Sequence, residues 1–105
     1  MCVGKWHLGQ KEEFLPPNHG FDSYMGIPYS VDMGFAFNNR TEGSWSEGNF
    51  YGCTPLPFME NTTAVEQPVD LSTVHKRYTT SAVDFVQRST NAAEPFFLYM
   101  VSHAL

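Results

Sequence analysis

The fold class of this 105-residue chain is decided near its end by the stretch PFFLYMV at residues 95–101. Pro95 opens the stretch, and residues 96–101 form a continuous apolar run without polar alternation. Such a run is typical of a strand covered on both faces, as in a parallel sheet. We therefore expect a buried strand over residues 96–101.

An amphipathic helix is expected directly before that strand. Asp70 or Ser72 can cap its start, and Asn91 is expected to end it. Its apolar side chains recur at helical spacing, with charged residues between them: Val74, Tyr78, Ala82, Phe85 and Val86. The first residues, MCVG at 1–4, indicate the tail of another strand. Strand, long crossover with a helix, and strand predict part of an α/β fold.

The middle of the chain is less regular. Residues 23–29 are expected to form a short helix or an irregular segment. Residues 31–70 show no sustained period and predict a long loop excursion, with short hairpin pieces around residues 35–37 and 49–51. The aromatic side chains expected in the core are Trp6, Phe21, Tyr24 and those of residues 96–99.

Composition and charge exclude several classes. With 42% hydrophobic and 16% charged residues the chain is not of disordered composition. The net charge of −5 and the absence of a basic run argue against a nucleic-acid partner. No segment of the sequence is long and apolar enough to span a bilayer, and none has the form of a signal peptide.

The stretch GKWHLG at residues 4–9 carries the most informative chemistry. If the backbone is extended there, Lys5 and His7 point to the same side, with Trp6 and Leu8 pointing away. A fixed ammonium beside an imidazole suits a tetrahedral oxyanion such as a sulfate or phosphate ester. The alternative is a solvated pair of loop residues.

Five sequence blocks, in order and approximate spacing, resemble the sulfatase family, in particular arylsulfatases of the A type. They are GKWHLG at 4–9, FLPP at 14–17, HGFD at 19–22, GIPYSVDMG at 26–34 and PFFLY at 95–99. The resemblance covers essentially the whole chain. It implies a large α/β domain with a mixed central sheet, related to alkaline phosphatase. Residues 1–105 would be an internal fragment of that catalytic domain.

The resemblance also implies hydrolysis of sulfate esters of aryl groups, sugars or sulfolipids. Lys5 matches the lysine that binds the sulfate and the leaving oxygen. His7 matches the histidine that hydrogen-bonds the nucleophile and assists sulfate elimination. Ser30 matches a serine of the substrate pocket, although it could simply be a turn serine.

The same resemblance implies a formylglycine nucleophile, made by the formylglycine-generating enzyme, and a bound calcium or magnesium ion. Nucleophile and metal ligands are expected outside this chain, so the fragment alone should be inactive and should not fold stably. The stretch CTPLP at 53–57 imitates the formylglycine motif but lacks its serine and arginine, and we reject it. Asp22 and Asp32 have no further carboxylate at ligand spacing and are assigned structural roles.

Two glycosylation sequons begin at Asn39 and Asn61. With the resemblance, they predict a lysosomal or secreted glycoprotein. Cys2 and Cys53 are expected to be small buried or free thiols. Two alternatives remain open: a phosphodiesterase or phosphonate hydrolase of the same superfamily, and a degenerate, non-catalytic relative.

Overall fold

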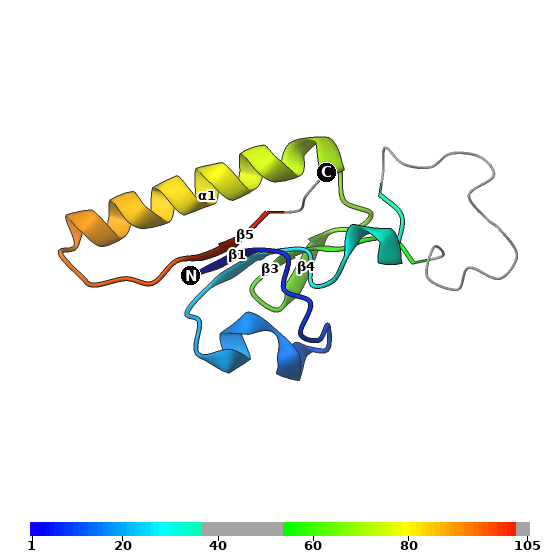
Figure 1. Ribbon diagram of the computed structural model, residues 1–105, viewed down its shortest axis with the longest axis horizontal. Helices are drawn as coiled ribbons and strands as arrows, with labels where there is room; N and C mark the ends of the chain where they lie inside the picture. The colour runs from blue at the N-terminus through cyan, green and yellow to red at the C-terminus, as the bar shows by residue number, and fades with distance from the viewer. Residues whose placement is uncertain (37–53, 103–105) are drawn as a thin grey trace, which may run out of the picture.

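The computed structural model of the protein describes residues 1–36 and 54–102, which form a mixed sheet with one long helix (Figure 1). The helix is α1 (Leu71–Asn91), and the strands are β1 (Cys2–Gly4), β2 (Tyr24–Gly26), β3 (Phe58–Glu60), β4 (Thr63–Glu66) and β5 (Tyr99–Val101). Three short 3₁₀ turns are η1 (Glu12–Phe14), η2 (Pro16–His19) and η3 (Val31–Met33).

The sheet has the strand order β4-β3-β2-β1-β5. β1 pairs in parallel with β2 and with β5, whereas the pairs β2–β3 and β3–β4 are antiparallel. The predicted α/β class is therefore confirmed. The first and last strands are direct neighbours in the sheet, with Val3 opposite Met100.

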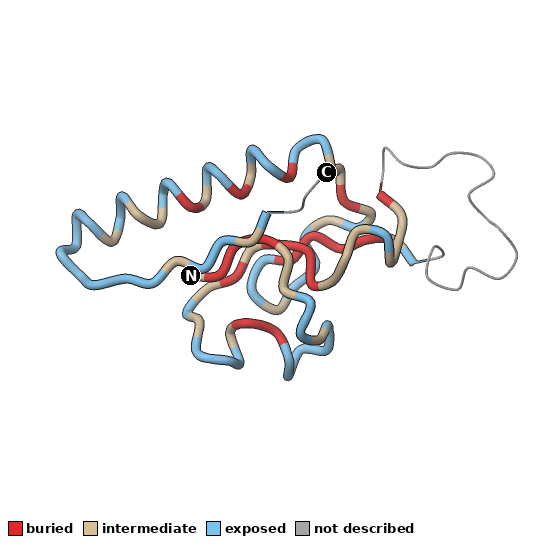
Figure 2. Tube along the Cα trace, in the orientation of Figure 1, coloured by how far each residue is buried: buried red, intermediate tan, exposed pale blue. Residues whose placement is uncertain are grey.

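Each face of the sheet has its own apolar cluster, because successive strand residues point to opposite faces. Val3 joins the larger cluster beneath α1, and Cys2 joins a smaller one on the other face with Leu15 and Tyr24. Figure 1 shows α1 along one side of the sheet and the segment with η1 and η2 on the opposite side. In Figure 2 the buried residues follow the central strands and the sheet-facing turns of α1.

The helix α1 confirms its predicted ends and its predicted apolar face. Asp70 is the N-cap, and its carboxylate accepts a hydrogen bond from the Ser72 backbone N–H at 2.9 Å. Three predicted inward residues are buried and two are partly buried: Val74, Tyr78 and Ala82, then Phe85 and Val86.

The first turns of α1 are also fastened to the hairpin that precedes them. Arg77 forms an ion pair with Glu66, and its guanidinium carbon lies 3.5 Å from the centroid of the Phe58 ring. Glu66 also accepts a hydrogen bond from the Asp70 backbone N–H at 2.8 Å. These contacts fix the position of the first turns of α1 relative to the β3–β4 hairpin.

The prediction of a buried strand over residues 96–101 is wrong in its length and its cover. β5 spans only Tyr99–Val101 and lies at an edge of the sheet, and the Phe97 side chain is 67% exposed. Phe96 and Tyr99 are exposed as well, so their assignment to the core is wrong. An apolar run indicates that its side chains are stable when buried, but it does not tell which segment of the protein packs over them.

The other aromatic residues that were expected in the core are buried or partly buried. Tyr24 is buried, as predicted, and Trp6 and Phe21 are partly buried against the cluster around Cys2. The rings of Trp6 and Phe21 meet edge to face, with centroids 6.2 Å apart.

The middle of the chain holds more strand than the sequence predicts. Residues 24–26 form β2 instead of a helix or irregular segment, since three residues cannot display either hydrophobic period. Residues 35 and 55 form an isolated bridge, while residues 37 and 49–51 lie outside the described part of the chain. The unpredicted β3–β4 hairpin turns at Asn61, whose φ of 55° suits an asparagine.

Candidate anion-binding site

The predicted site residues follow the carboxyl ends of the parallel strands, the edge where open α/β sheets bind ligands. Lys5 comes directly after β1, and its backbone N–H donates to the Val101 carbonyl at the end of β5 (3.2 Å). The His7 backbone N–H donates to the Pro28 carbonyl (2.9 Å), two residues before Ser30. The sheet topology thus brings three segments that are distant in sequence close together: residues 5–7, residues 28–30 and the end of β5.

Gly4 makes this convergence possible. Its φ is 108°, and a Cβ there would lie 1.8 Å from the Val101 carbonyl oxygen. Only glycine, which has no Cβ, can take this φ at the end of β1 while its Cα lies so close to the backbone of β5. The Gly4 that opens the lysine motif is therefore part of how the site is built.

The condition of an extended backbone through GKWHLG, on which the same-side argument depends, is not met. The strand ends at Gly4, and His7 has a φ of 62°, in the left-handed region. The alternation argument for Lys5 and His7 therefore does not apply. Left-handed conformations of residues other than glycine cost about 1–3 kcal/mol and cluster at functional sites.

The two side chains nevertheless share an environment, because both act on Asp32. The pKa of Asp32 is lowered, first by a hydrogen bond from the Ser30 hydroxyl and next by a backbone hydrogen bond. Burial opposes this lowering, and the electrostatic effects of Lys5 and His7 lower the pKa of Asp32 further by smaller amounts. Lys5, His7, Ser30 and Asp32 therefore form one cluster, which we call the anion cluster.

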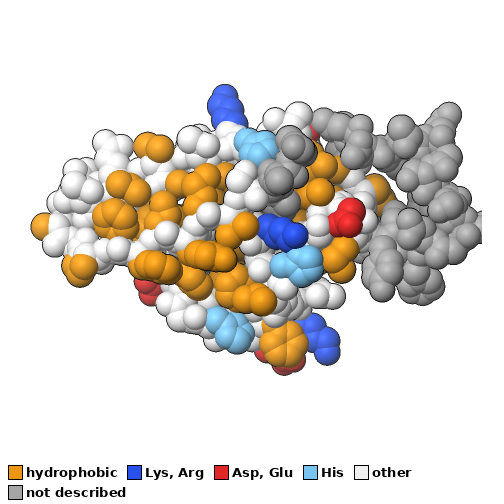
Figure 3. All heavy atoms as spheres, in the orientation of Figure 1, with side chains coloured by type: hydrophobic (Ala, Val, Ile, Leu, Met, Phe, Trp, Pro, Cys, Tyr) orange, Lys and Arg blue, Asp and Glu red, His pale blue; other side chains and the backbone are white. Residues whose placement is uncertain are grey.

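The anion cluster is open to solvent in the described part of the chain. Lys5 and Ser30 are partly buried, whereas His7 and Asp32 are exposed. Figure 3 shows a basic, a histidine and an acidic side chain close together near the middle of the face in view. Asp32 is the member that the sequence assigned a structural role, although it stands only two residues after Ser30.

The anion cluster does not fit a calcium site. Calcium takes six to eight oxygen ligands, whereas the cluster offers one carboxylate beside an ammonium that repels cations. Among the described residues no group of three or more His, Cys, Asp or Glu could hold a metal ion.

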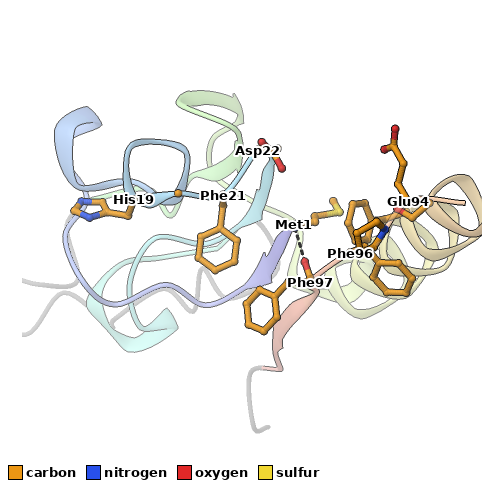
Figure 4. A pocket seen from close by; sticks show the side chains of 11 residues that line it. Met1, His19, Phe21, Asp22, Glu94, Phe96 and Phe97 are labelled. Atoms are coloured by element: carbon orange, nitrogen blue, oxygen red, sulfur yellow. Dashed lines mark hydrogen bonds between the residues drawn. The ribbon is translucent and has the colours of Figure 1, made fainter. Parts of the chain in front are cut away.

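A second hollow lies at the amino ends of the strands and contains none of the predicted site residues (Figure 4). This cavity of about 390 Å³ has an aromatic wall in which the Phe21 and Phe97 rings stack with centroids 6.0 Å apart. Asp22 and Glu94 add carboxylates at its rim. An acidic, aromatic hollow does not suit an anion.

Of the two sequons, the structure describes only that of Asn61, and Asn39 lies outside the described residues, as does Cys53. Asn61 is exposed in the β3–β4 turn, and its side-chain oxygen accepts a hydrogen bond from the Tyr24 backbone N–H (3.1 Å). Cys2 is a buried free thiol, as expected. In the described ranges no helix has the length and apolarity needed to cross a membrane.

Comparisons with known proteins agree with the sequence blocks. The chain is 38% identical to arylsulfatase G of Rattus norvegicus over 93% of its length, and 38% identical to arylsulfatase A of Bos taurus over 96%. It is 33% identical to N-acetylgalactosamine-6-sulfatase of Canis lupus familiaris over 92%. These matches cover 21%, 21% and 18% of the relatives, so the chain spans about a fifth of their length. No family model matches the chain.

A lysine, a histidine and a serine at the carboxyl edge of a mixed α/β sheet, with this similarity along nearly the whole chain, mark a sulfatase segment. The chain belongs to the sulfatases, and within them it is similar to the arylsulfatases G and A.

Proposed function

We propose that the full-length protein hydrolyses sulfate esters of aryl groups, sugars or sulfolipids, and that this chain supplies the part of the active site that grips the sulfate. The supporting observation is the anion cluster, in which Lys5, His7 and Ser30 meet at the carboxyl ends of β1 and β2. The surrounding domain would be the alkaline-phosphatase-like sulfatase domain.

Each residue has a distinct task in this proposal. Lys5 neutralises the charge that develops on the ester oxygen as its bond to sulfur breaks. His7 holds and returns a proton at a ring nitrogen next to the nucleophile. Ser30 binds a sulfate oxygen through its hydroxyl group.

The remaining chemistry comes from outside this chain. A formylglycine, produced by the formylglycine-generating enzyme, would supply the attacking oxygen. Calcium or magnesium would be held by other residues of the domain. Mass spectrometry of the full-length protein should find the formylglycine, and an unmodified cysteine or serine in every nucleophile-motif peptide would contradict its role.

The deciding experiment measures hydrolysis of 4-methylumbelliferyl sulfate and of bis(4-nitrophenyl) phosphate by the full-length protein. We expect turnover of the sulfate ester with at least a hundredfold preference in kcat/KM. A preference for the phosphate diester would instead support the phosphodiesterase alternative. Turnover of neither ester would support a degenerate, non-catalytic relative.

The isolated 105-residue chain should show no turnover, because it lacks the nucleophile. We also propose that it does not fold stably by itself, which the exposed apolar side chains of Phe96, Phe97, Tyr99 and Met100 support. A cooperative thermal unfolding transition of the isolated chain would contradict that proposal.

We propose a lysosomal or secreted location, with glycans at Asn39 and Asn61. The exposed position of Asn61 supports glycan attachment there. Treatment with peptide N-glycosidase should lower the apparent mass of the full-length protein, and an unchanged mass would contradict glycosylation.

A further inference from the structure

Trp6 lies between Lys5 and His7 in the lysine motif, residues 4–9, and its side chain packs into the fold. The indole is partly buried against the smaller apolar cluster with Cys2, whereas His7 is exposed. The Trp6 backbone N–H donates to the Ile27 carbonyl at 3.2 Å, between the backbone hydrogen bonds of its two neighbours. Trp6 therefore attaches the motif to the fold through its side chain as well as its backbone.

The indole N–H makes a specific hydrogen bond to a neighbouring turn. Its Nε1 donates to the Phe14 carbonyl at 2.7 Å. Phe14 is the last residue of η1, and its own backbone N–H donates to the Lys11 carbonyl at 2.8 Å. Leu15 follows directly and is buried in the same apolar cluster as Cys2. The indole thus connects the lysine motif to a turn that the core holds in place.

Ring contacts restrain the indole further. Phe21 meets it edge to face and the His19 ring lies tilted to it, each with centroids 6.2 Å from those of the indole. The chain also passes closely by Phe14 at Gly9, where a Cβ would lie 2.6 Å from the Phe14 Cβ. A ring held by a hydrogen bond and by packing restrains its own Cα, and so restrains the residues on either side of it.

The backbone at His7 depends on such restraint. Its φ of 62° lies in the left-handed region. Strained conformations of this kind persist only where the surrounding contacts hold them. The indole of Trp6 supplies contacts directly before His7, and the hydrogen bond to the Pro28 carbonyl supplies another at His7 itself. Loss of the indole contacts should therefore let the imidazole and the nearby ammonium move.

We propose that Trp6 is a positioning residue, whose indole holds the Lys5 ammonium and the His7 imidazole where they can bind a sulfate group. This role rests on the proposed function and adds the residue that fixes the geometry of its site. Misplacing a reacting or binding group by about 1 Å can cost about a hundredfold. The backbone hydrogen bonds of the motif remain without the indole, so we expect a smaller loss, about tenfold.

The test compares Trp6→Phe with a matched control, Asn18→Ala, in the full-length protein. Trp6→Phe keeps an aromatic ring and removes the N–H donor. Asn18 donates from Nδ2 to the Glu12 carbonyl, also at 2.7 Å, but lies outside the lysine motif. Each variant thus loses one side-chain hydrogen bond to a carbonyl of η1. Calorimetry gives the dissociation constant for inorganic sulfate, and urea unfolding gives the stability of each variant.

We expect Trp6→Phe to bind sulfate about ten times more weakly, while Asn18→Ala stays within about twofold of the unsubstituted protein. If Trp6→Phe keeps the full affinity, or if both variants lose affinity equally, Trp6 only stabilises the fold and the proposed role is wrong. Failure of the unsubstituted protein to bind sulfate would also overturn it.

A second variant decides the question if Trp6→Phe does not fold. Phe21→Leu keeps the indole N–H donor and removes the ring that packs edge to face against the indole. Because the hydrogen bond to Phe14 remains, the affinity for sulfate should fall less, by about threefold. An unchanged affinity in Phe21→Leu would then overturn the role of Trp6.

A third measurement tests whether Trp6 acts through Lys5. Trp6→Phe should lower kcat/KM for 4-methylumbelliferyl sulfate about tenfold, but less than about threefold when Lys5→Ala is already present. An undiminished loss in the double variant would contradict a positioning role. Absence of turnover in the unsubstituted protein would contradict only the proposed function, because the sulfate affinities decide the role of Trp6 without it.

Discussion

The two ends of the parallel strands β1, β2 and β5 differ in what the chain places there. At the carboxyl ends lie the polar members of the anion cluster, held by backbone hydrogen bonds between loops. At the amino ends lie stacked aromatic rings around an acidic hollow. The same strands thus support anion chemistry at one end and apolar packing at the other, as expected for a parallel α/β sheet.

The largest effect should come from removing the ammonium at the carboxyl end. Lys5→Ala in the full-length protein should lower kcat/KM for an aryl sulfate about a thousandfold, because the leaving oxygen loses its neutralising charge. Lys11→Ala removes an exposed lysine at the start of η1 and should leave the rate within twofold. Equal losses in both variants would show that the site lies elsewhere.

The next effect tests how the carboxyl end is built. Gly4→Ala should destabilise the full-length protein by about 3 kcal/mol, since the new Cβ meets the Val101 carbonyl oxygen and φ is 108°. Gly20→Ala is the control, because Gly20 also has a positive φ, 89°, but nothing lies within 4 Å. It should cost about 1 kcal/mol. Urea unfolding measures both, and similar costs would contradict the close-approach argument.

A smaller effect is expected at the amino end of β2. Asn61→Gln should remove both the glycan and the hydrogen bond to the Tyr24 backbone, at a cost of about 1 kcal/mol beyond loss of the glycan. Thr63→Ala removes the sequon but keeps Asn61, and so isolates the contribution of the glycan. Thermal unfolding of the two variants should differ, and identical curves would mean that the hydrogen bond contributes nothing.

The smallest effect concerns the buried thiol beneath the sheet. Burial raises the pKa of Cys2 to about 11 from its ordinary 9.0. The unfolded thiol therefore ionises first, and stability present below pH 9 is lost as the pH rises toward 11. Between pH 8 and 10 the loss should be about 1 kcal/mol, and the same urea series on Cys2→Ala should lack this component.

The sequence predicted the helix well, because its cap and its apolar spacing involve only residues close together in the chain. The cap at Asp70 and the spacing from Val74 to Val86 define α1 because helix formation needs only neighbouring residues. The strands β2 and β3 have three residues each, too few to show a period, and their pairing is decided by distant partners. The exposure of β5 could not be predicted, since cover depends on which segment packs over it.

The sequence names candidate site residues, which stay a prediction, but it does not give their geometry. Motifs pointed to Lys5, His7 and Ser30, but the left-handed φ of His7 depends on its hydrogen bond to Pro28, which no spacing rule reveals. Asp32 was visible in the sequence, but the η3 turn that places it two residues after Ser30 was not predicted.

The exposed apolar side chains around β5 have a consequence for how the protein behaves in a cell. Chaperones and proteases act on molecules that present apolar, strand-forming surface. The rings of Phe97 and Tyr99 present such surface until another part of the molecule covers them. Substitutions at that interface should therefore lower the amount of protein that escapes quality control, even when every residue of the anion cluster is intact.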